Sequence, residues 1–200
     1  MGERERAMVA PGRGAFQGRA VVMDAGDVQR AIWRIAHEVI EHNRGTASLV
    51  LVGLQTGGVW FAEALGAVIT SVSGAAVPVG SLDVAYYRDD FGLRPVVPAA
   101  ATELPVPVDG AVVVLCDDVL FTGRTVRAAL NALGDHGRPA CVQLAVMVDR
   151  GHRELPVRPD FVGKNLPTRR TEMVDVTAGG VVLGDLAGPD GAPQGQEGDQ

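Results

Sequence analysis

Three stretches of this chain are continuously apolar over about the length of a strand. They lie at residues 49–54, 111–116 and 140–148, and such runs are typical of parallel strands that are buried on both faces. Before and between them, apolar residues recur every three or four positions, which predicts amphipathic helices. Strands that alternate with helices predict an α/β fold, in which helices flank a central, mostly parallel sheet.

The first helix has clear end signals. Asp24 or Asp27 can cap its start, and Gly45 ends it. Two more helices are predicted, one after the Thr-Gly-Gly loop at 56–58 and one over residues 124–134, and a further strand is predicted around residues 77–87. The apolar stripes of the three helices are Val28, Ile32, Ile35, Val39 and Ile40; then Val59, Ala62, Leu65 or Gly66, Ile69 and Val72; then Val126, Ala129, Leu130 and Leu133.

The two ends of the chain lack this patterning. Residues 1–19 are rich in glycine, arginine and alanine without periodicity, and they are expected to form a disordered lead. Residues 188–200 contain no apolar side chain larger than alanine, so they cannot offset the loss of chain entropy and are expected to be a disordered tail. A single domain is expected over residues 20–187. Within it, residues 88–110 are interpreted as a flexible hairpin, or small hood.

Composition and charge limit the possible functions. Hydrophobic residues make up 46% of the 200 positions and charged residues 21%, as in soluble globular proteins. No apolar run approaches the ~20 residues that span a bilayer, and the charged N-terminus is unlike a secretory signal, so a cytoplasmic protein without a membrane partner is expected. Cys116 and Cys141 are expected to be small buried residues. The net charge of −6 means that any nucleic-acid site must be a local basic patch.

The strongest chemical signal begins where the second apolar strand ends. Asp117 and Asp118 are followed by the loop 121–125, Phe-Thr-Gly-Arg-Thr, and then by a predicted helix. Ligands of open α/β sheets bind beyond the carboxyl ends of strands, and the first N–H groups of a helix attract anions. Two carboxylates beside such an anion cradle can accept hydrogen bonds from sugar hydroxyls, so the segment predicts a site for a ribose 5-phosphate group. The alternative is that the two acids merely end a strand and cap a helix.

This combination of strand, acid pair and Thr-Gly loop resembles the phosphoribosyl pyrophosphate (PRPP) signature of type I phosphoribosyltransferases. Three further segments resemble the PyrR family: SLDVAYYRDDF (81–91), VDRGHRELPVRPDFVGKNLPT (148–168) and IWRIAHEVIE (32–41). The resemblance covers about residues 20–176 and implies a type I phosphoribosyltransferase fold. It also implies two functions, uracil phosphoribosyltransferase and RNA-binding regulator of pyrimidine genes. Walker A and dinucleotide-binding fingerprints are absent, which argues against an ATPase or a dehydrogenase.

The resemblance implies that uracil and PRPP give UMP and pyrophosphate. Mg²⁺ would be held mainly by substrate and water, with Asp117 and Asp118 as the only protein groups near it. The acid pair would hold the ribose hydroxyls, and Arg88 would reach the pyrophosphate unless its segment is a solvated hairpin. Substrate-binding residues are then expected to be Thr56, Gly57, Gly58, Asp117, Asp118, Val119, Leu120, Phe121, Thr122, Gly123, Arg124 and Thr125. On the uracil side they are Val148, Asp149 and Arg150, and the alternative for the last two is a surface ion pair.

Two positions depart from related enzymes. Purine transferases of this fold usually carry an acid where this chain has Phe121, which cannot accept a proton, so a pyrimidine is favoured. The PyrR family usually has Thr-Arg-Gly in the loop that wraps pyrophosphate, whereas this chain has Thr56-Gly57-Gly58. Loss of one charged contact to a developing anion commonly costs about 2–4 kcal/mol. A weak transferase, with regulation as its main role, is therefore expected.

A basic segment follows the third apolar strand. Residues 150–170 contain six arginine or lysine residues and two acids, a local charge of +4. In the PyrR family a basic face of a homodimer or higher oligomer binds an mRNA stem-loop, and UMP or UTP modulates that binding. The matching positions here are His37, His152, Arg153, Arg158 and Lys164. Trp33 departs from the small polar residue usual in the family, and it is expected to be buried or packed in a dimer, with stacking on an RNA base as the alternative.

Three hypotheses remain at this point. The chain is a bifunctional regulator and uracil phosphoribosyltransferase, or a nucleotide-sensing RNA-binding regulator whose catalysis has faded. The third hypothesis is a transferase for another base without an RNA role, in which the basic segment is only a solvated surface.

Overall fold

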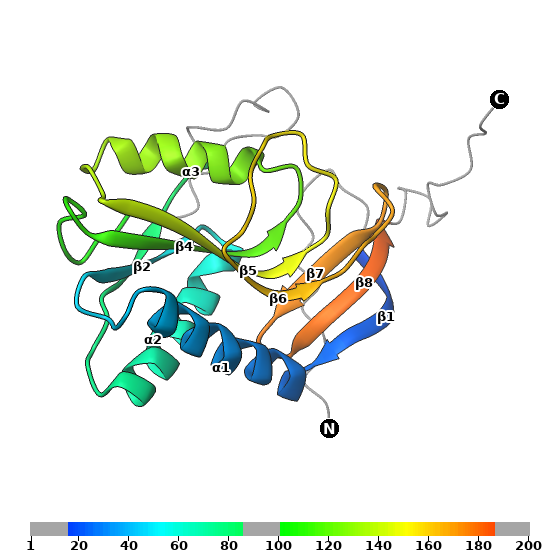
Figure 1. Cartoon of the computed structure of the whole chain (residues 1–200). Helices are drawn as coiled ribbons and strands as arrows, with labels where there is room; N and C mark the ends of the chain where they lie inside the picture. The colour runs from blue at the N-terminus through cyan, green and yellow to red at the C-terminus, as the bar shows by residue number, and fades with distance from the viewer. Residues whose placement is uncertain (1–15, 86–100, 187–200) are drawn as a thin grey trace.

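The computed structural model describes residues 16–85 and 101–186 of the chain (Figure 1). These residues form two sheets and three helices. In chain order the elements are β1 (Phe16–Asp24), α1 (Ala25–His42), β2 (Leu49–Leu54), α2 (Gly57–Ser73), β3 (Val79–Leu82), β4 (Val112–Leu120), α3 (Arg124–Gly134), β5 (Cys141–Asp149), β6 (Phe161–Asn165), β7 (Met173–Thr177) and β8 (Gly180–Leu186).

The larger sheet has five strands in the order β3-β2-β4-β5-β6, and every neighbouring pair is parallel. Helices α1 and α2 cover one face, and α3 lies on the other (Figure 1). All six residues of β2 are buried, as expected for a strand covered on both sides. The predicted α/β fold with a parallel central sheet is confirmed. Strand β3 is shorter than the predicted strand at 77–87, and β6 was not predicted.

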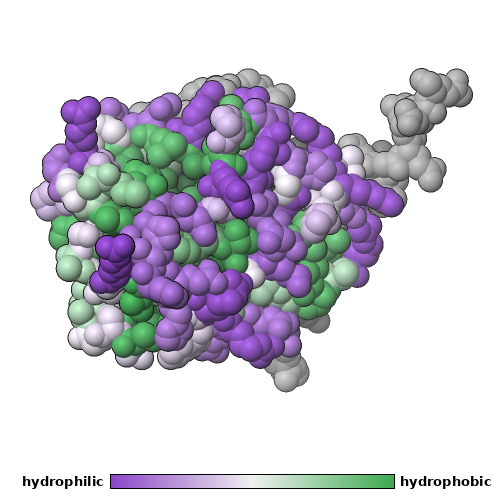
Figure 2. All heavy atoms as spheres, in the orientation of Figure 1, coloured by the Kyte–Doolittle hydropathy of each residue, from purple (hydrophilic) through white to green (hydrophobic). Residues whose placement is uncertain are grey.

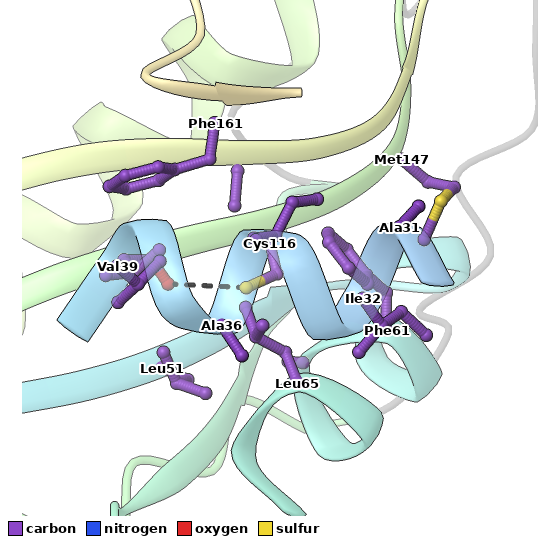
Figure 3. Packing of buried hydrophobic residues seen from close by; sticks show 14 of the residues in the cluster. Ala31, Ile32, Ala36, Val39, Leu51, Phe61, Leu65, Cys116, Met147 and Phe161 are labelled. Atoms are coloured by element: carbon purple, nitrogen blue, oxygen red, sulfur yellow. Dashed lines mark hydrogen bonds between the residues drawn. The ribbon is translucent and has the colours of Figure 1, made fainter. Parts of the chain in front are cut away.

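Each face of this sheet has its own hydrophobic core. The core under α1 and α2 includes Ile35, Phe61 and Met147, and Figure 3 shows their neighbours packed around the inward side of α1. Cys116 lies in this core, where its Sγ is 3.7 Å from the carbonyl oxygen of Val114. The core under α3 brings Val126 and Leu133 against β4 and β5. Leu130, predicted to face this core, is 45% exposed, because the buried side of α3 is shifted toward Ala128 and Ala132.

Both ends of α1 are fixed by side chains. At its start, the Asp24 carboxylate accepts from the Asp27 N–H, and the Asp27 carboxylate accepts from the Asp24 N–H, so both predicted capping residues take part. At its end, the side-chain amides of Asn43 and Gln143 exchange two hydrogen bonds of 2.8 and 3.0 Å. This pair ties the end of α1 to β5.

A second sheet, which we call the hood, has three antiparallel strands in the order β1-β8-β7. Its first strand starts at Phe16, so residues 16–19 belong to the hood and their assignment to a disordered lead was wrong. Nearly all of β1 is exposed, which removes the alternation that would have marked it as a strand. The hood therefore pairs the start of the domain with its end. The hairpin predicted at 88–110 lies mostly outside the described residues; within 101–110, Glu103 forms an antiparallel bridge with Ser81.

One smaller expectation also fails. Cys141, the first residue of β5, is exposed rather than buried, because it precedes the covered part of that strand. Trp33 is 41% exposed on the outer side of α1, so it is not buried within the chain, and its packing in a dimer stays a prediction. In the part of the chain that the structure describes, no helix is long and apolar enough to cross a membrane.

Candidate functional site

The acid pair lies at the carboxyl end of β4, the middle strand of the parallel sheet. Asp117 is only 7% exposed, although it is charged. Its Oδ1 accepts from the Asp118 N–H at 3.0 Å, and the Oδ1 of Asp118 accepts from the Val119 N–H at 2.7 Å. These local bonds fix both carboxylates at the edge of the sheet where ligands of α/β proteins bind.

Burial changes the acidity of one member of this pair. Burial raises the pKa of the Asp118 carboxyl above its usual range, against the lowering effect of the hydrogen bond from Val119. The carboxylate of Asp175, on β7 of the hood, raises it further. Keeping this group ionised therefore costs free energy, which is a common property of side chains at functional sites.

The loop after β4 is shaped to lead directly into α3. Gly123 has a φ of +91°, the left-handed region that favours glycine, and it is the residue that precedes the helix. A Cβ atom there would also come within 3.3 Å of Val157. Because the first N–H groups of a helix have no acceptor within it, the loop and the start of α3 together offer donors that an anion could accept from.

The segment that follows β5 holds this loop from its carbonyl side. The Arg153 guanidinium donates to the Phe121 carbonyl at 2.7 Å, and the Glu154 N–H donates to the Thr122 carbonyl at 3.0 Å. The Glu154 carboxylate accepts from Arg124 Nε at 2.8 Å. The loop is thereby clamped in one conformation. The guanidinium of Arg124, predicted to add charge to a phosphate site, is directed at least in part to Glu154.

The second predicted loop, before α2, approaches the acid pair closely. A Cβ atom on Gly58 would collide with the backbone of β4 at Cys116, and one on Gly57 would collide with the carboxylate of Asp118. The peptide bond between Gln55 and Thr56 is cis. The structure thus brings residues 56–58 and 117–118 together as predicted, and no side chain fits between them.

A hollow of about 370 Å³ lies at the carboxyl ends of β5 and β6. Two of the three residues predicted on the uracil side line it, whereas the side chain of the third, Val148, is fully buried in the core. The lining residues are Asp149, Arg150, Gly151, His152, Asn165, Pro167 and Thr168.

Arg150 links this hollow to the loop of residues 121–123 before α3, which we call the phosphate loop after its predicted ligand. It is only 4% exposed, and its guanidinium carbon lies 4.2 Å from the centre of the Phe121 ring. Its Nε donates to Thr168 Oγ1 at 3.0 Å and its Nη2 to the Arg169 carbonyl at 2.9 Å. Asp149 pairs instead with Arg153, at 2.5 Å. The alternative of a surface ion pair between Asp149 and Arg150 is therefore wrong.

The five residues predicted to contact RNA do not form one cluster in this chain. His37 lies on the exposed side of α1, its ring 6.3 Å from that of Trp33, and Lys164 lines a hollow of about 330 Å³ beside the same helix. Figure 2 shows hydrophilic residues along this face. His152 lies instead at the phosphate loop, 5.7 Å from the Phe121 ring.

Arg153 and Arg158, the other two, differ in exposure. Arg158 is exposed. Arg153 is partly buried, and besides Asp149 and Phe121 it donates to the Val157 carbonyl at 3.0 Å. These contacts favour a structural role for Arg153.

Several residues of the site carry no local signal in the sequence. Glu172 is a buried carboxylate that accepts from the Arg169 N–H and from Arg19 of β1. Asn165, the last residue of β6, and Thr168, in the segment after it, line the hollow. Their roles depend on contacts with distant parts of the chain. Arg88, predicted to reach pyrophosphate, lies outside the described residues.

Comparisons with known proteins agree with this geometry. Residues 22–176 match the family model for the phosphoribosyl transferase domain. The chain is 55% identical over 157 residues to the bifunctional protein PyrR of Geobacter sulfurreducens, covering 78% of this chain and 89% of that protein. It is 52% identical over 169 residues to the bifunctional protein PyrR of Brevibacillus brevis, covering 84% and 94%.

Solved structures show the same fold at low identity. A hypoxanthine phosphoribosyltransferase of Trypanosoma cruzi superposes with a TM-score of 0.66 at 15% identity, covering 84% of this chain and 98% of that chain. One from Staphylococcus aureus gives 0.64 at 17% identity, covering 86% and 94%. These likenesses support the type I phosphoribosyltransferase fold.

Proposed function

The chain belongs to the PyrR family, and on that basis we propose that it transfers phosphoribose from PRPP to uracil and regulates pyrimidine genes through RNA. One observation carries the catalytic half of this proposal. Asp117, which is buried, and Asp118 lie near the carboxyl end of β4, shortly before the loop that leads into α3, and the hollow lies at the ends of β5 and β6, the next strands of the sheet. These three neighbouring features can receive the phosphate, the ribose and the base of a nucleotide.

On the phosphate side, the 5-phosphate binds at the start of α3, where N–H groups and the hydroxyls of Thr122 and Thr125 donate to its oxygens. The acid pair accepts hydrogen bonds from the ribose 2- and 3-hydroxyls. Because the local backbone bonds already orient both carboxylates, little reorganisation is needed when the sugar binds.

Transfer to the base requires cleavage of the bond between the ribose C1 and pyrophosphate. The transition state resembles an oxocarbenium ion, so the ionised acid pair next to the ribose favours the positive charge that develops there. Uracil enters from the hollow lined by Asp149 and Arg150, and its N1 attacks C1 from the side opposite the leaving pyrophosphate. The N1–C1 bond forms as the C1–O bond to pyrophosphate breaks, and the N1 proton is released to water.

The acid pair offers only a few of the ligands that Mg²⁺ needs. Oxygen ligands suit Mg²⁺, and the acid pair offers carboxylate oxygens at the edge of the site, but no group of three or more metal-ligating side chains occurs among the described residues. The ion would therefore be bound mostly through PRPP and water, and it would neutralise charge on the departing pyrophosphate.

The loop of residues 56–58, which we call the pyrophosphate loop, has no side-chain cation at Gly57. Backbone N–H groups of residues 56–58 contact the leaving group instead. We propose that catalysis is consequently slow and that nucleotide sensing is the larger part of the function.

The transferase is tested by measuring PRPP-dependent conversion of uracil, with hypoxanthine and orotate in parallel. UMP formation from uracil, and no turnover of the other two bases, is the expected result. Preferred turnover of hypoxanthine or orotate would replace this proposal with a transferase for another base.

The regulatory half is supported by the basic surface of α1 and β6. Arg34 and Lys164 line the same hollow, and Trp33 and His37 lie on the exposed side of the same helix. We propose that mRNA phosphates bind here, in a homodimer or higher oligomer, and that unpaired loop bases supply specificity. A gel shift with the pyrimidine-operon leader, with and without UMP, tests this. Binding that ignores UMP would separate RNA recognition from nucleotide sensing.

A further inference from the structure

The hood contributes a buried carboxylate whose contacts lead toward the base side of the site. We propose that Glu172, paired with Arg19, is a positioning residue for uracil: it fixes the segment after β6 and, through that segment, Arg150 at the wall of the hollow. This inference rests on the proposed function, because it assumes that the hollow beyond β5 receives the base. It adds a role for the hood in substrate recognition.

Glu172 is held on both of its oxygens. Its side chain is only 8% exposed, its Oε2 accepts from the Arg169 N–H at 2.7 Å, and its Oε1 pairs with the guanidinium of Arg19. The Glu172 N–H donates back to the Arg169 carbonyl at 3.2 Å, which closes a turn. A buried carboxylate needs such partners, so the position of the turn and the charge of Glu172 depend on each other.

The same turn holds Arg150. The carbonyl of Arg169 accepts from Arg150 Nη2 at 2.9 Å, and the side chain of Thr168 accepts from Arg150 Nε at 3.0 Å. The carbonyl of Thr168 lies 2.6 Å from His152 Nε2. Arg150, His152 and Thr168 all line the hollow, so a displacement of the turn would move three parts of its wall together.

Arg19 provides a matched control, because it pairs with two carboxylates. One is Glu172, which is linked to the hollow through the turn. The other is Asp185 on β8, at 3.3 Å, which is 37% exposed and whose only ion pair among the described residues is with Arg19. Neutralising either carboxylate removes one charge partner of Arg19. Only the first change alters the segment beside the base.

The experiment compares Glu172→Gln with Asp185→Asn in the full-length protein. For Glu172→Gln we expect KM for uracil and Kd for UMP to rise about tenfold, while kcat and KM for PRPP change less than twofold. Asp185→Asn should change all four values less than twofold. An equal rise in KM for both substrates, or no rise for uracil, would overturn the proposal. If Glu172→Gln does not fold, Arg19→Met takes its place, with Arg19→Lys expected to restore part of the uracil affinity.

Hydrogen exchange separates this proposal from the proposed function. In the ligand-free protein, amides of residues 166–172 should exchange faster in Glu172→Gln than in wild type, and Asp185→Asn should leave them unchanged. A wild-type protein that fails to convert uracil would contradict the proposed function without affecting this measurement. Unchanged exchange in Glu172→Gln would rule out the positioning role even if the transferase is active.

Discussion

The phosphate side and the base side of this site are built in different ways. On the phosphate side, the acid pair, the glycine turn and the start of α3 all come from residues 117–125. The bonds of the acid pair join neighbours in sequence, and only the clamp on the loop comes from the segment after β5. On the base side, the hollow is lined from β5 and β6, and its wall depends on Glu172 and on Arg19, which is 153 positions away. The first is a local motif, whereas the second exists only when the hood is assembled.

This difference indicates whether a substitution in each region should change the rate of the reaction or the choice of base. A local motif keeps its geometry as long as the strand and helix form, so it suits a chemical group that every PRPP-dependent enzyme shares. A wall made from distant segments can move without disturbing the core, and it can thus be altered for another base. Changes on the phosphate side should affect chemistry, and changes on the base side should affect selectivity.

The largest expected effect lies on the phosphate side. The double variant Asp117→Asn, Asp118→Asn should lose at least about 10³-fold in transfer, because both charges that orient the ribose and favour the oxocarbenium ion are gone. Steady-state UMP formation measures this, and circular dichroism and thermal unfolding should show that the fold is retained. Turnover close to that of wild type would remove the acid pair from the mechanism.

The missing cation of the pyrophosphate loop gives the next effect. Gly57→Arg adds a charge but also a Cβ atom that collides with the Asp118 carboxylate, whereas Gly57→Ala adds only the Cβ atom. We expect the arginine variant to exceed the alanine variant about 30-fold in kcat/KM, which is about 2 kcal/mol of transition-state stabilisation. Equal activities would mean that the cation has no role in this loop.

A smaller effect is expected from the turn before α3. Gly123→Ala should destabilise the protein by about 1–2 kcal/mol and weaken PRPP binding, because alanine is strained at a φ of +91° and lies against Val157. Gly134→Ala is the control: it lies in the same helix with no atom within 4 Å of its Cβ, and alanine favours a helix. Denaturant unfolding measures both. A loss of stability at residue 134 equal to that at 123 would contradict the local strain.

The smallest expected effect is on folding stability, which the carboxyls of Asp118 and Glu172 should change in opposite directions as the pH changes. The pKa of Asp118 is raised by burial, so its ionised form destabilises the fold, and Asp118→Asn should stabilise the protein at pH 7. The pKa of Glu172 is lowered by the Arg169 N–H and by Arg19, so its contribution to stability is present above its usual pKa of 4.5 and is lost as pH falls through its folded value. Glu172→Gln should therefore destabilise at pH 7.

Both differences should shrink as the pH falls toward 4. The Asp118 carboxyl takes up its proton first because its pKa is raised, whereas the contribution of Glu172 declines below pH 4.5 and is lost only as the pH falls through its lower folded pKa. Urea unfolding of the two variants and wild type at pH 7 and pH 4 measures them. If the two variants shift stability in the same direction at pH 7, the assignment of opposite electrostatic environments is wrong.

Much of the site could be anticipated because its residues are neighbours in the chain. The acid pair, the loop 121–125 and the helix after it were predicted together, and the structure keeps this order, except that β4 continues past the acid pair to Leu120. The base side was predicted less well. Asp149 and Arg150 were placed near the base, but Arg150 was not expected to be buried under Phe121, and Glu172 had no signal at all. Arg153 was assigned to RNA, although its bonds clamp the phosphate loop.

Local patterns in the sequence determined the strands β2 to β5 of the parallel sheet, the three helices, and the acid pair with the loop that follows it. Strand burial, helix periodicity and a strand–loop–helix turn are all encoded within a few consecutive residues. Only the tertiary structure decided the hood and the wall of the base hollow. The strand β1 is exposed and unpatterned, and it forms because β8 offers hydrogen-bond partners. A buried carboxylate such as Glu172 is likewise stable only where Arg19 meets it, and no property of residues 165–175 alone specifies that meeting.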